Sequence, residues 1–161
     1  MCSIIKHMIY KPVLVFFLLF LASVVSATTL ETVKDLRTLK QQSETEKLPI
    51  LLLFTADDCD YCDAIRQFYL IPMIQSGRYA SLVLFRQLYV EEYTLIRDEN
   101  GRMVGGDQIA LKYNVQVTPT ILFLDAQGNE LVERIVGLSG ADFFDHQLNQ
   151  QISRLQKNIN D

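Results

Sequence analysis

The segment "FTADDCDYCDAI", residues 54–65, places two cysteines and four aspartates within twelve positions. Cys59 and Cys62 have the Cys-x-x-Cys spacing, which serves redox exchange, zinc binding or a small structural disulfide. A structural zinc site needs four cysteine or histidine ligands, and after residue 27 the chain holds only these two cysteines and His146. A disulfide that closes so short a loop stabilises little, because its contribution grows with loop length. The motif therefore predicts redox exchange.

Residues 1–27 have the three parts of a secretory signal peptide. A basic start is followed by the apolar or small residues 13–25, and the small residues of "VSA" end at Ala27. The apolar run is shorter than the ~20 residues that a membrane-spanning helix needs, so we expect cleavage near Ala27 rather than an uncleaved membrane anchor. The prediction is an exported, periplasmic product with one folded domain over residues 28–161.

Charge and size exclude several classes of protein. The formal net charge of −4 moves to −6 when the signal peptide leaves with its two lysines. An acidic domain is a poor partner for nucleic acid or anionic lipid, so we expect neither. The remaining chain is long enough to bury a core without disulfide staples. In an oxidising compartment, Cys59 and Cys62 are then free to serve chemistry.

Hydrophobic patterns predict an α/β fold with a mixed sheet. Two apolar runs, residues 48–56 and 81–90, are expected as buried parallel strands, joined by a helix over residues 59–75. Pro72 is expected to kink or end that helix. A helix is expected over 28–47, opened by a capping box Thr28-x-x-Glu31. Residues 91–106 are expected to form either a small hairpin or another ordered excursion, because Asn100-Gly101 is a tight-turn pair. The remaining expected elements are a helix over 107–113 stopped by Asn114, a strand opened by Thr118-Pro119, its antiparallel partner over 131–136 and a last helix from Ser139.

The chain resembles the thioredoxin superfamily in three blocks, "LLLFTADDCDYC", "IALKYNVQVTPTILFLD" and "ERIVGLSGADFFDHQL", which lie within about residues 48–150. The resemblance implies a thioredoxin fold, a three-layer α/β/α arrangement with a central mixed sheet. It also implies a cis Pro119 packed against a Cys59–Cys62 disulfide, with the Thr118 backbone binding an extended substrate strand. The alternative for this proline is an ordinary trans residue that opens a strand.

Within the superfamily, the likeness is strongest to periplasmic thioredoxin-like proteins of the SoxW-like kind. Tyr61, before the second cysteine, is similar to the residue at that place in bacterial disulfide isomerases, and we expect it to contact substrate. The isomerases dimerise through a separate domain, for which this chain has no room, so a monomer is expected.

The residues around the cysteines depart from ordinary thioredoxins. The family has a tryptophan before the first cysteine and Gly-Pro between the two, whereas this chain has Asp58 and Asp60-Tyr61. The family's buried aspartate is replaced by Leu53, and a lysine on the next strand by Gln87. We therefore expect that the acid–base pair that helps to deprotonate the second cysteine is absent.

The two cysteines have different predicted roles. Cys59 begins the helix, which lowers the pKa of a thiol, so it is the predicted nucleophile, and Cys62, one turn later, is the predicted resolving cysteine. Asp57, Asp58 and Asp60 are predicted to tune the pair, because nearby negative charge disfavours a thiolate. As an alternative, Asp58 caps the helix and Asp60 complements its dipole.

The predicted function is that of a thiol–disulfide oxidoreductase without a cofactor that reduces the disulfides of client proteins. A strongly oxidising site stabilises its thiolate, and the acidic cluster works against this. The disulfide of a reductase in an oxidising compartment has to be reduced again after each reaction, so a membrane electron donor is expected as a partner. The base that deprotonates the second cysteine stays open between Asp57, Glu91 and water.

Two other classes remain open from the sequence. One is a non-catalytic binding module in which the disulfide is permanent and the Pro119 face binds a partner. The other is a copper-handling protein, since two thiolates suit Cu(I). Related copper chaperones add a histidine near the following strands, and no histidine lies between Cys59 and Asp145.

Overall fold

The structure is a computed structural model that describes residues 29–160, so the signal peptide predicted for residues 1–27 lies outside the described residues. Within the described part of the chain, no helix has both the length and the apolar character needed to cross a membrane.

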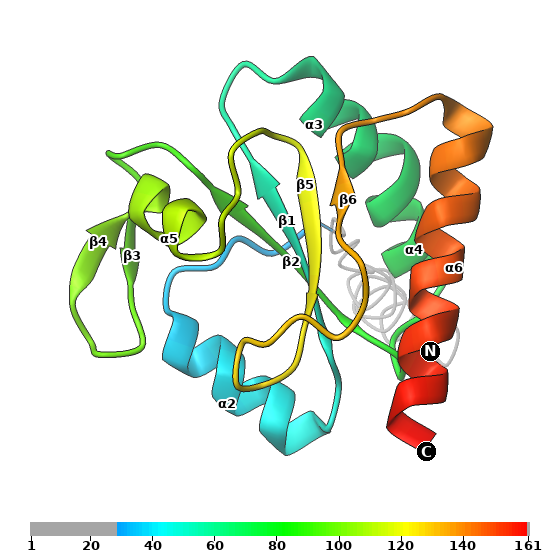
Figure 1. The fold of residues 1–161 in the computed structure, drawn as a ribbon, viewed down its shortest axis with the longest axis horizontal. Helices are drawn as coiled ribbons and strands as arrows, with labels where there is room; N and C mark the ends of the chain where they lie inside the picture. The colour runs from blue at the N-terminus through cyan, green and yellow to red at the C-terminus, as the bar shows by residue number, and fades with distance from the viewer. Residues whose placement is uncertain (1–28, 161) are drawn as a thin grey trace, which may run out of the picture.

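A central mixed sheet separates two layers of helices (Figure 1). The strand order is β2 (Leu84–Tyr89), β1 (Ile50–Thr55), β5 (Thr120–Leu124), β6 (Ile135–Val136). Helices α2 (Leu36–Glu46) and α5 (Gly106–Lys112) lie on one face, and α3 (Asp60–Ile65), α4 (Ile71–Gln75) and α6 (Ala141–Asn160) lie on the other. Strand β1 runs parallel to β2 and antiparallel to β5. This confirms the predicted three-layer α/β/α arrangement.

Strand β1 is buried along its whole length because both of its faces are covered. Leu51 and Leu53 pack in the core between the sheet and helices α3 and α6, where Phe144 and Leu148 contribute from α6. Leu52, the residue between them, belongs to the second core beneath α2 and α5. Successive side chains of a strand point to opposite faces, so the unbroken apolar run of β1 fills both cores.

The described residues before α2 are extended and not helical. Residues 29–35 run beside β2, and backbone hydrogen bonds of 2.8 and 2.9 Å join them to the N–H and C=O groups of Gln87. The helix predicted over 28–47 therefore begins only at α2, where Asp35 is the N-cap residue. The predicted capping box is wrong, because its Glu31 lies in the extended segment. The exposed edge of β2 offers backbone hydrogen bonds that compete with helix formation.

The helical segment that follows the cysteines contains a wide turn. Between α3 and α4 lies η1 (Arg66–Leu70), a π-helical turn in which the Ile71 N–H donates to the Arg66 carbonyl. Pro72 has no N–H group, and its ring clashes with a carbonyl one regular turn earlier, so the wider turn accommodates it. The helix then continues to Gln75. Pro72 thus widens the helix and does not end it.

Of the two forms expected for residues 91–106, the structure has the hairpin, which is made by β3 (Leu95–Arg97) and β4 (Met103–Gly105). Asp98 holds its turn, since its Oδ1 accepts the backbone N–H groups of Asn100 at 2.9 Å and Arg102 at 2.8 Å. Burial raises the pKa of Asp98, but the N–H donors and the charge of Arg102 outweigh it and lower this pKa overall. Asn114, after α5, adopts the expected left-handed conformation with φ 53°. Strand β6 is shorter than the predicted residues 131–136.

The packing predicts unequal costs for two leucine truncations. Leu53→Ala empties part of a fully buried core site and should lower the free energy of unfolding by about 2–5 kcal/mol. Leu111→Ala is the matched control, because Leu111 is 76% exposed on α5 and should change stability by less than about 0.5 kcal/mol. Urea unfolding followed by circular dichroism measures both. Equal losses in the two variants would contradict the assigned core.

Candidate redox site

The first cysteine caps the helix that it begins. After β1 the chain turns through Asp58, which has φ 53°, and Cys59 takes the N-cap position of α3. Its Sγ accepts the backbone N–H of Cys62 at 3.2 Å. The capping role expected for Asp58 is therefore wrong, since a residue in the left-handed conformation precedes the cap. Asp60 lies in the first turn of α3, where a carboxylate complements the helix dipole.

The two cysteines form a disulfide with an S–S distance of 2.10 Å and a Cα–Cα distance of 5.2 Å. Cys59 is partly exposed, whereas Cys62 is fully buried. One sulfur can therefore meet a partner from solvent, and the other lies behind it. Between the two cysteines, Asp60 is exposed to solvent, and so is Tyr61, which is 65% exposed.

The loop before β5 lies beside the disulfide. The Thr118–Pro119 peptide bond is cis, and the Thr118 hydroxyl lies 3.9 Å from Cys59 Sγ. Pro119 is buried, and its carbonyl accepts the Gly137 N–H at 2.8 Å, which ties the loop to β6. A hollow of about 150 Å³ adjoins this loop, lined by Val90, Ala110 and residues 115–118.

An acidic rim borders the disulfide on the solvent side. Asp57, Asp58 and Asp60 are all exposed. The Asp57 N–H donates to Glu91 Oε1 at 2.6 Å, and the Tyr93 hydroxyl donates to the Asp57 carboxylate. Both carboxylates considered as bases for the second cysteine are thus engaged in holding the turn before Cys59 to the segment after β2.

Tyr93 belongs to the site although nothing in its sequence context marks it. Its hydrogen bond to Asp57 raises the pKa of Tyr93 to about 12, with further contributions from burial and from the charges of Asp57, Glu91 and Asp58. The hydroxyl therefore stays protonated near neutral pH and remains a donor. The ring is well exposed, so it adds an apolar surface beside Asp57.

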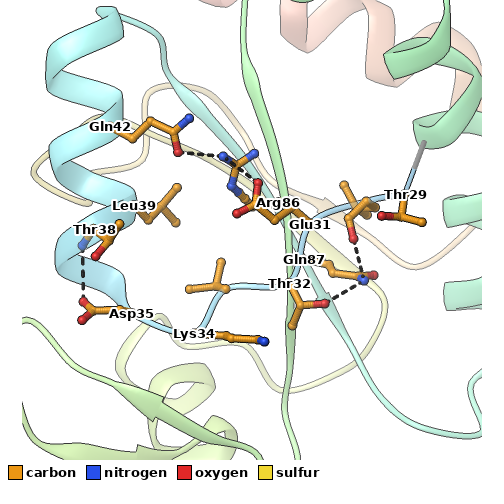
Figure 2. A pocket seen from close by; sticks show the side chains of 12 residues that line it. Thr29, Glu31, Thr32, Lys34, Asp35, Thr38, Leu39, Gln42, Arg86 and Gln87 are labelled. Atoms are coloured by element: carbon orange, nitrogen blue, oxygen red, sulfur yellow. Dashed lines mark hydrogen bonds and ion pairs between the residues drawn. The ribbon is translucent and has the colours of Figure 1, made fainter. Parts of the chain in front are cut away.

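Behind the disulfide, the pair that ordinary thioredoxins use is replaced by neutral residues. Leu53 and Gln87 are direct neighbours in the β1–β2 ladder, and both are buried. The Gln87 amide donates to the Leu30 carbonyl and to the Thr32 hydroxyl, both at 3.0 Å (Figure 2). Its oxygen accepts a hydrogen bond from Arg66 Nε at 2.8 Å.

Arg66 is the second functional candidate that sequence reasoning missed. Its guanidinium reaches from the end of α3 to the sheet, where Nη2 donates to the Thr55 hydroxyl at 3.1 Å. Nη1 pairs with Asp63, and the guanidinium carbon lies 5.8 Å from the ring centroid of Tyr89. The only signal in the sequence is a basic residue four positions after Cys62.

A groove of about 740 Å³ lies between residues 29–35, helix α2 and strand β2 (Figure 2). Arg86 spans it, with Nη2 2.7 Å from the Gln42 amide oxygen and 3.1 Å from a carboxylate oxygen of Glu31. Arg86 and Gln87 are adjacent in β2, so their side chains leave opposite faces of the sheet. The groove residues on the α2 side are therefore separated from the disulfide by the sheet.

Within residues 29–160, no group of three or more histidine, cysteine, aspartate or glutamate side chains is placed to hold a metal ion.

Fold and site together define a class. A thioredoxin fold with a Cys-x-x-Cys disulfide at the start of the helix after the central strand is that of a thiol–disulfide oxidoreductase. The chain belongs to the thioredoxin-like domain family, whose model matches residues 36–152.

Solved structures show the same fold at low sequence identity. A poplar thioredoxin h mutant superposes with a TM-score of 0.55 at 15% identity over 82% of this chain and 86% of that chain. A thioredoxin of Malassezia sympodialis gives 0.54 at 19% identity over 80% of this chain and 95% of that chain. The C-terminal domain of DsbD from Neisseria meningitidis, in the oxidised form, gives 0.50 at 21% identity over 74% of this chain and 97% of that chain. No curated protein matches the sequence.

The acidic rim predicts a shift in reduction potential. Asp58→Asn combined with Asp60→Asn removes two charges beside Cys59, and asparagine tolerates the left-handed conformation of residue 58. Less repulsion of the thiolate should raise the reduction potential by tens of millivolts, where ~30 mV corresponds to about 1.4 kcal/mol. Equilibration with glutathione buffers, read by mass after alkylation, measures the shift.

The control for this variant removes two exposed charges elsewhere. Glu44→Gln combined with Glu46→Gln changes helix α2 and should leave the potential unchanged. If the site variant also keeps the wild-type potential, the aspartates do not tune the cysteines.

Proposed function

We propose that this protein is an exported, periplasmic reductase of disulfides in client proteins. The observation that carries the proposal is the asymmetry of the two sulfurs. Cys59 is partly exposed at the helix N-terminus, and Cys62 is fully buried behind it. A reductase needs one sulfur that a client can reach and a second that only the first can reach.

The surroundings of Cys59 support its role as the nucleophile. The Cys62 N–H already donates to Cys59 Sγ at 3.2 Å, and this bond strengthens when the sulfur becomes a thiolate. The partial positive charge of the helix N-terminus acts in the same direction. Thr118 adds a hydroxyl within 3.9 Å of the same sulfur.

The acidic rim supports reduction as the direction of exchange. Asp57, Asp58 and Asp60 oppose the thiolate that the helix start favours, so the reduced form is stabilised less than in a strong oxidant. The dithiol is then a better electron donor. Its two electrons pass to the client disulfide, which becomes two thiols, while Cys59 and Cys62 become the disulfide.

Clients are proposed to bind across the exposed border of the site. Tyr61 lies between the two cysteines in the sequence, Tyr93 is bonded to Asp57, and both rings are well exposed. Val117, next to Thr118, is exposed as well. The backbone of the Thr118–Pro119 loop is the proposed partner for an extended client strand, by β-augmentation. A membrane electron donor that reaches the periplasm is proposed to return the disulfide to the dithiol.

The rival function, a binding module with a permanent disulfide, makes the opposite prediction for reactivity. The proposal expects the wild-type protein to reduce the interchain disulfides of insulin when dithiothreitol supplies electrons. Turbidity from the released chains measures this. A wild-type protein that gives no acceleration over dithiothreitol alone would favour the binding module.

Single-cysteine variants separate the two roles. Cys62→Ser keeps the accessible sulfur, so oxidised glutathione should form a stable mixed disulfide at Cys59, because no second thiol is present to release it. Cys59→Ser leaves only the buried sulfur and should form little adduct and alkylate slowly. Intact mass after timed exposure measures both, and faster reaction at Cys62 would reverse the assignment.

A further inference from the structure

We propose that Arg66 is a positioning residue of the redox site. Its guanidinium is fixed between the sheet and helix α3, here called the redox helix, and assists loss of the Cys62 thiol proton in the resolving step. The inference rests on the proposed function, since it concerns the second half of the same exchange. In ordinary thioredoxins, a buried aspartate and a lysine help to deprotonate the second cysteine. Leu53 and Gln87 replace that pair here, and the proposal assigns the same task to Arg66.

The guanidinium is held from several directions. Nε donates to Gln87 in β2, and Nη2 donates to Thr55 at the end of β1, at 2.8 and 3.1 Å. Nη1 pairs with Asp63 on the redox helix itself. The planar guanidinium presents its donors in a rigid fork, so these contacts fix both its position and its orientation.

Register explains why the partners converge. Leu53 pairs with Gln87 and Thr55 pairs with Tyr89 in the parallel β1–β2 ladder. Alternate residues share a face, so these four side chains point toward the redox helix at the carboxyl ends of the two strands. The cation therefore lies over the part of the sheet from which the chain leads to Cys59.

Arg66 follows the buried Cys62 by one turn of the helix. Its N–H donates to the Cys62 carbonyl, which is the regular α-helical hydrogen bond between residues four apart. Side chains at this spacing are neighbours, with Cβ atoms about 5–6 Å apart. The wide turn begins after this bond, so it leaves the relation between Cys62 and Arg66 intact.

The positive charge of Arg66 is less exposed to water than the carboxylate of Asp63 that pairs with it. The Arg66 side chain is 18% exposed, whereas its partner Asp63 is 54% exposed. Water screens the carboxylate more than the inner edge of the guanidinium. Tyr89 beneath the cation is an aromatic ring without formal charge. The buried side of the redox helix therefore keeps a positive field, which favours a thiolate over a thiol.

The resolving step uses this field as follows. After Cys59 has attacked a client disulfide, its sulfur is bonded to one client sulfur, and the other client sulfur has left as a thiolate. Cys62 then loses its proton to water and attacks the Cys59 sulfur. The Cys59–Cys62 bond forms, the bond from Cys59 to the client breaks, and the client sulfur leaves with the electron pair and takes up a proton.

An aromatic disulfide, dithiobis(nitrobenzoate), separates the two attacks. The pre-reduced protein should release one coloured thionitrobenzoate when Cys59 attacks and a second when Cys62 resolves the adduct. Stopped-flow absorbance follows both. Arg66→Gln should slow the second release about tenfold, since loss of a neighbouring opposite charge raises a thiol pKa by about one unit, and leave the first release within about twofold.

Two more variants distinguish charge from structure. Arg66→Lys keeps the charge and should retain the second rate within about threefold, although one ammonium cannot match the fork of contacts. Asp63→Asn loosens the same network but removes the countercharge, so it should speed the second release or leave it unchanged. If Arg66→Gln does not fold, these two variants still decide, because slowing in both would assign the network a structural role only.

Arg86→Gln is the matched control. Like Arg66, Arg86 is a mostly buried arginine with an acidic partner, and its side chain is 12% exposed. It precedes Gln87 in β2, but its side chain faces α2 (Figure 2). Both releases should keep wild-type rates in this variant. Equal slowing in the Arg66 and Arg86 variants, or equal slowing of both releases in Arg66→Gln, would overturn the role of Arg66. A wild-type protein that releases no thionitrobenzoate would instead overturn the proposed function.

Discussion

The structure depends on the burial of strand β1 between β2, which runs parallel to it, and β5, which runs antiparallel to it. Because β1 runs parallel to β2, the carboxyl ends of both strands meet at one edge of the sheet. Because β5 runs antiparallel to β1, with Phe54 opposite Thr120, the start of β5 reaches the same edge. The turn that carries Cys59 and the loop that carries Pro119 are thus brought together by strand pairing alone, from positions far apart in the sequence.

The electrostatic environment differs on the two sides of the disulfide. The solvent side carries Asp57, Asp58 and Asp60, which oppose a thiolate on Cys59. The buried side carries the guanidinium of Arg66, which favours a thiolate on Cys62. Under the proposed function, the first sulfur is a moderate nucleophile and a good electron donor, and Arg66 assists the second sulfur when it resolves the mixed disulfide. The proposal thus accounts for how the second half of the exchange proceeds although Leu53 replaces the buried acid.

The sequence predicted the sheet, the redox helix and the hairpin, because each has a strong local signal in an apolar run, a Cys-x-x-Cys or an Asn-Gly turn. It failed for residues 29–35, where the apolar spacing of Leu30 and Val33 is helical but the edge of β2 supplies hydrogen bonds that only an extended chain can use. It also failed for Arg66, because its partners become visible only once the register of β1 and β2 is known. Local sequence patterns thus predict single helices and strands, whereas the site residues that lie close together are known only once the strand pairing is known.

The central claim is that Cys59 and Cys62 form an exchangeable, electron-donating pair. Its most direct test is the reduction potential of the wild-type protein, from equilibration with glutathione and dithiothreitol buffers and mass analysis after alkylation. The account predicts a reversible two-electron transition nearer to the thioredoxin value of about −270 mV than to the value of about −120 mV of a strong oxidant. A disulfide that stays intact in both buffers, or a potential at the oxidant end of this range, would contradict it.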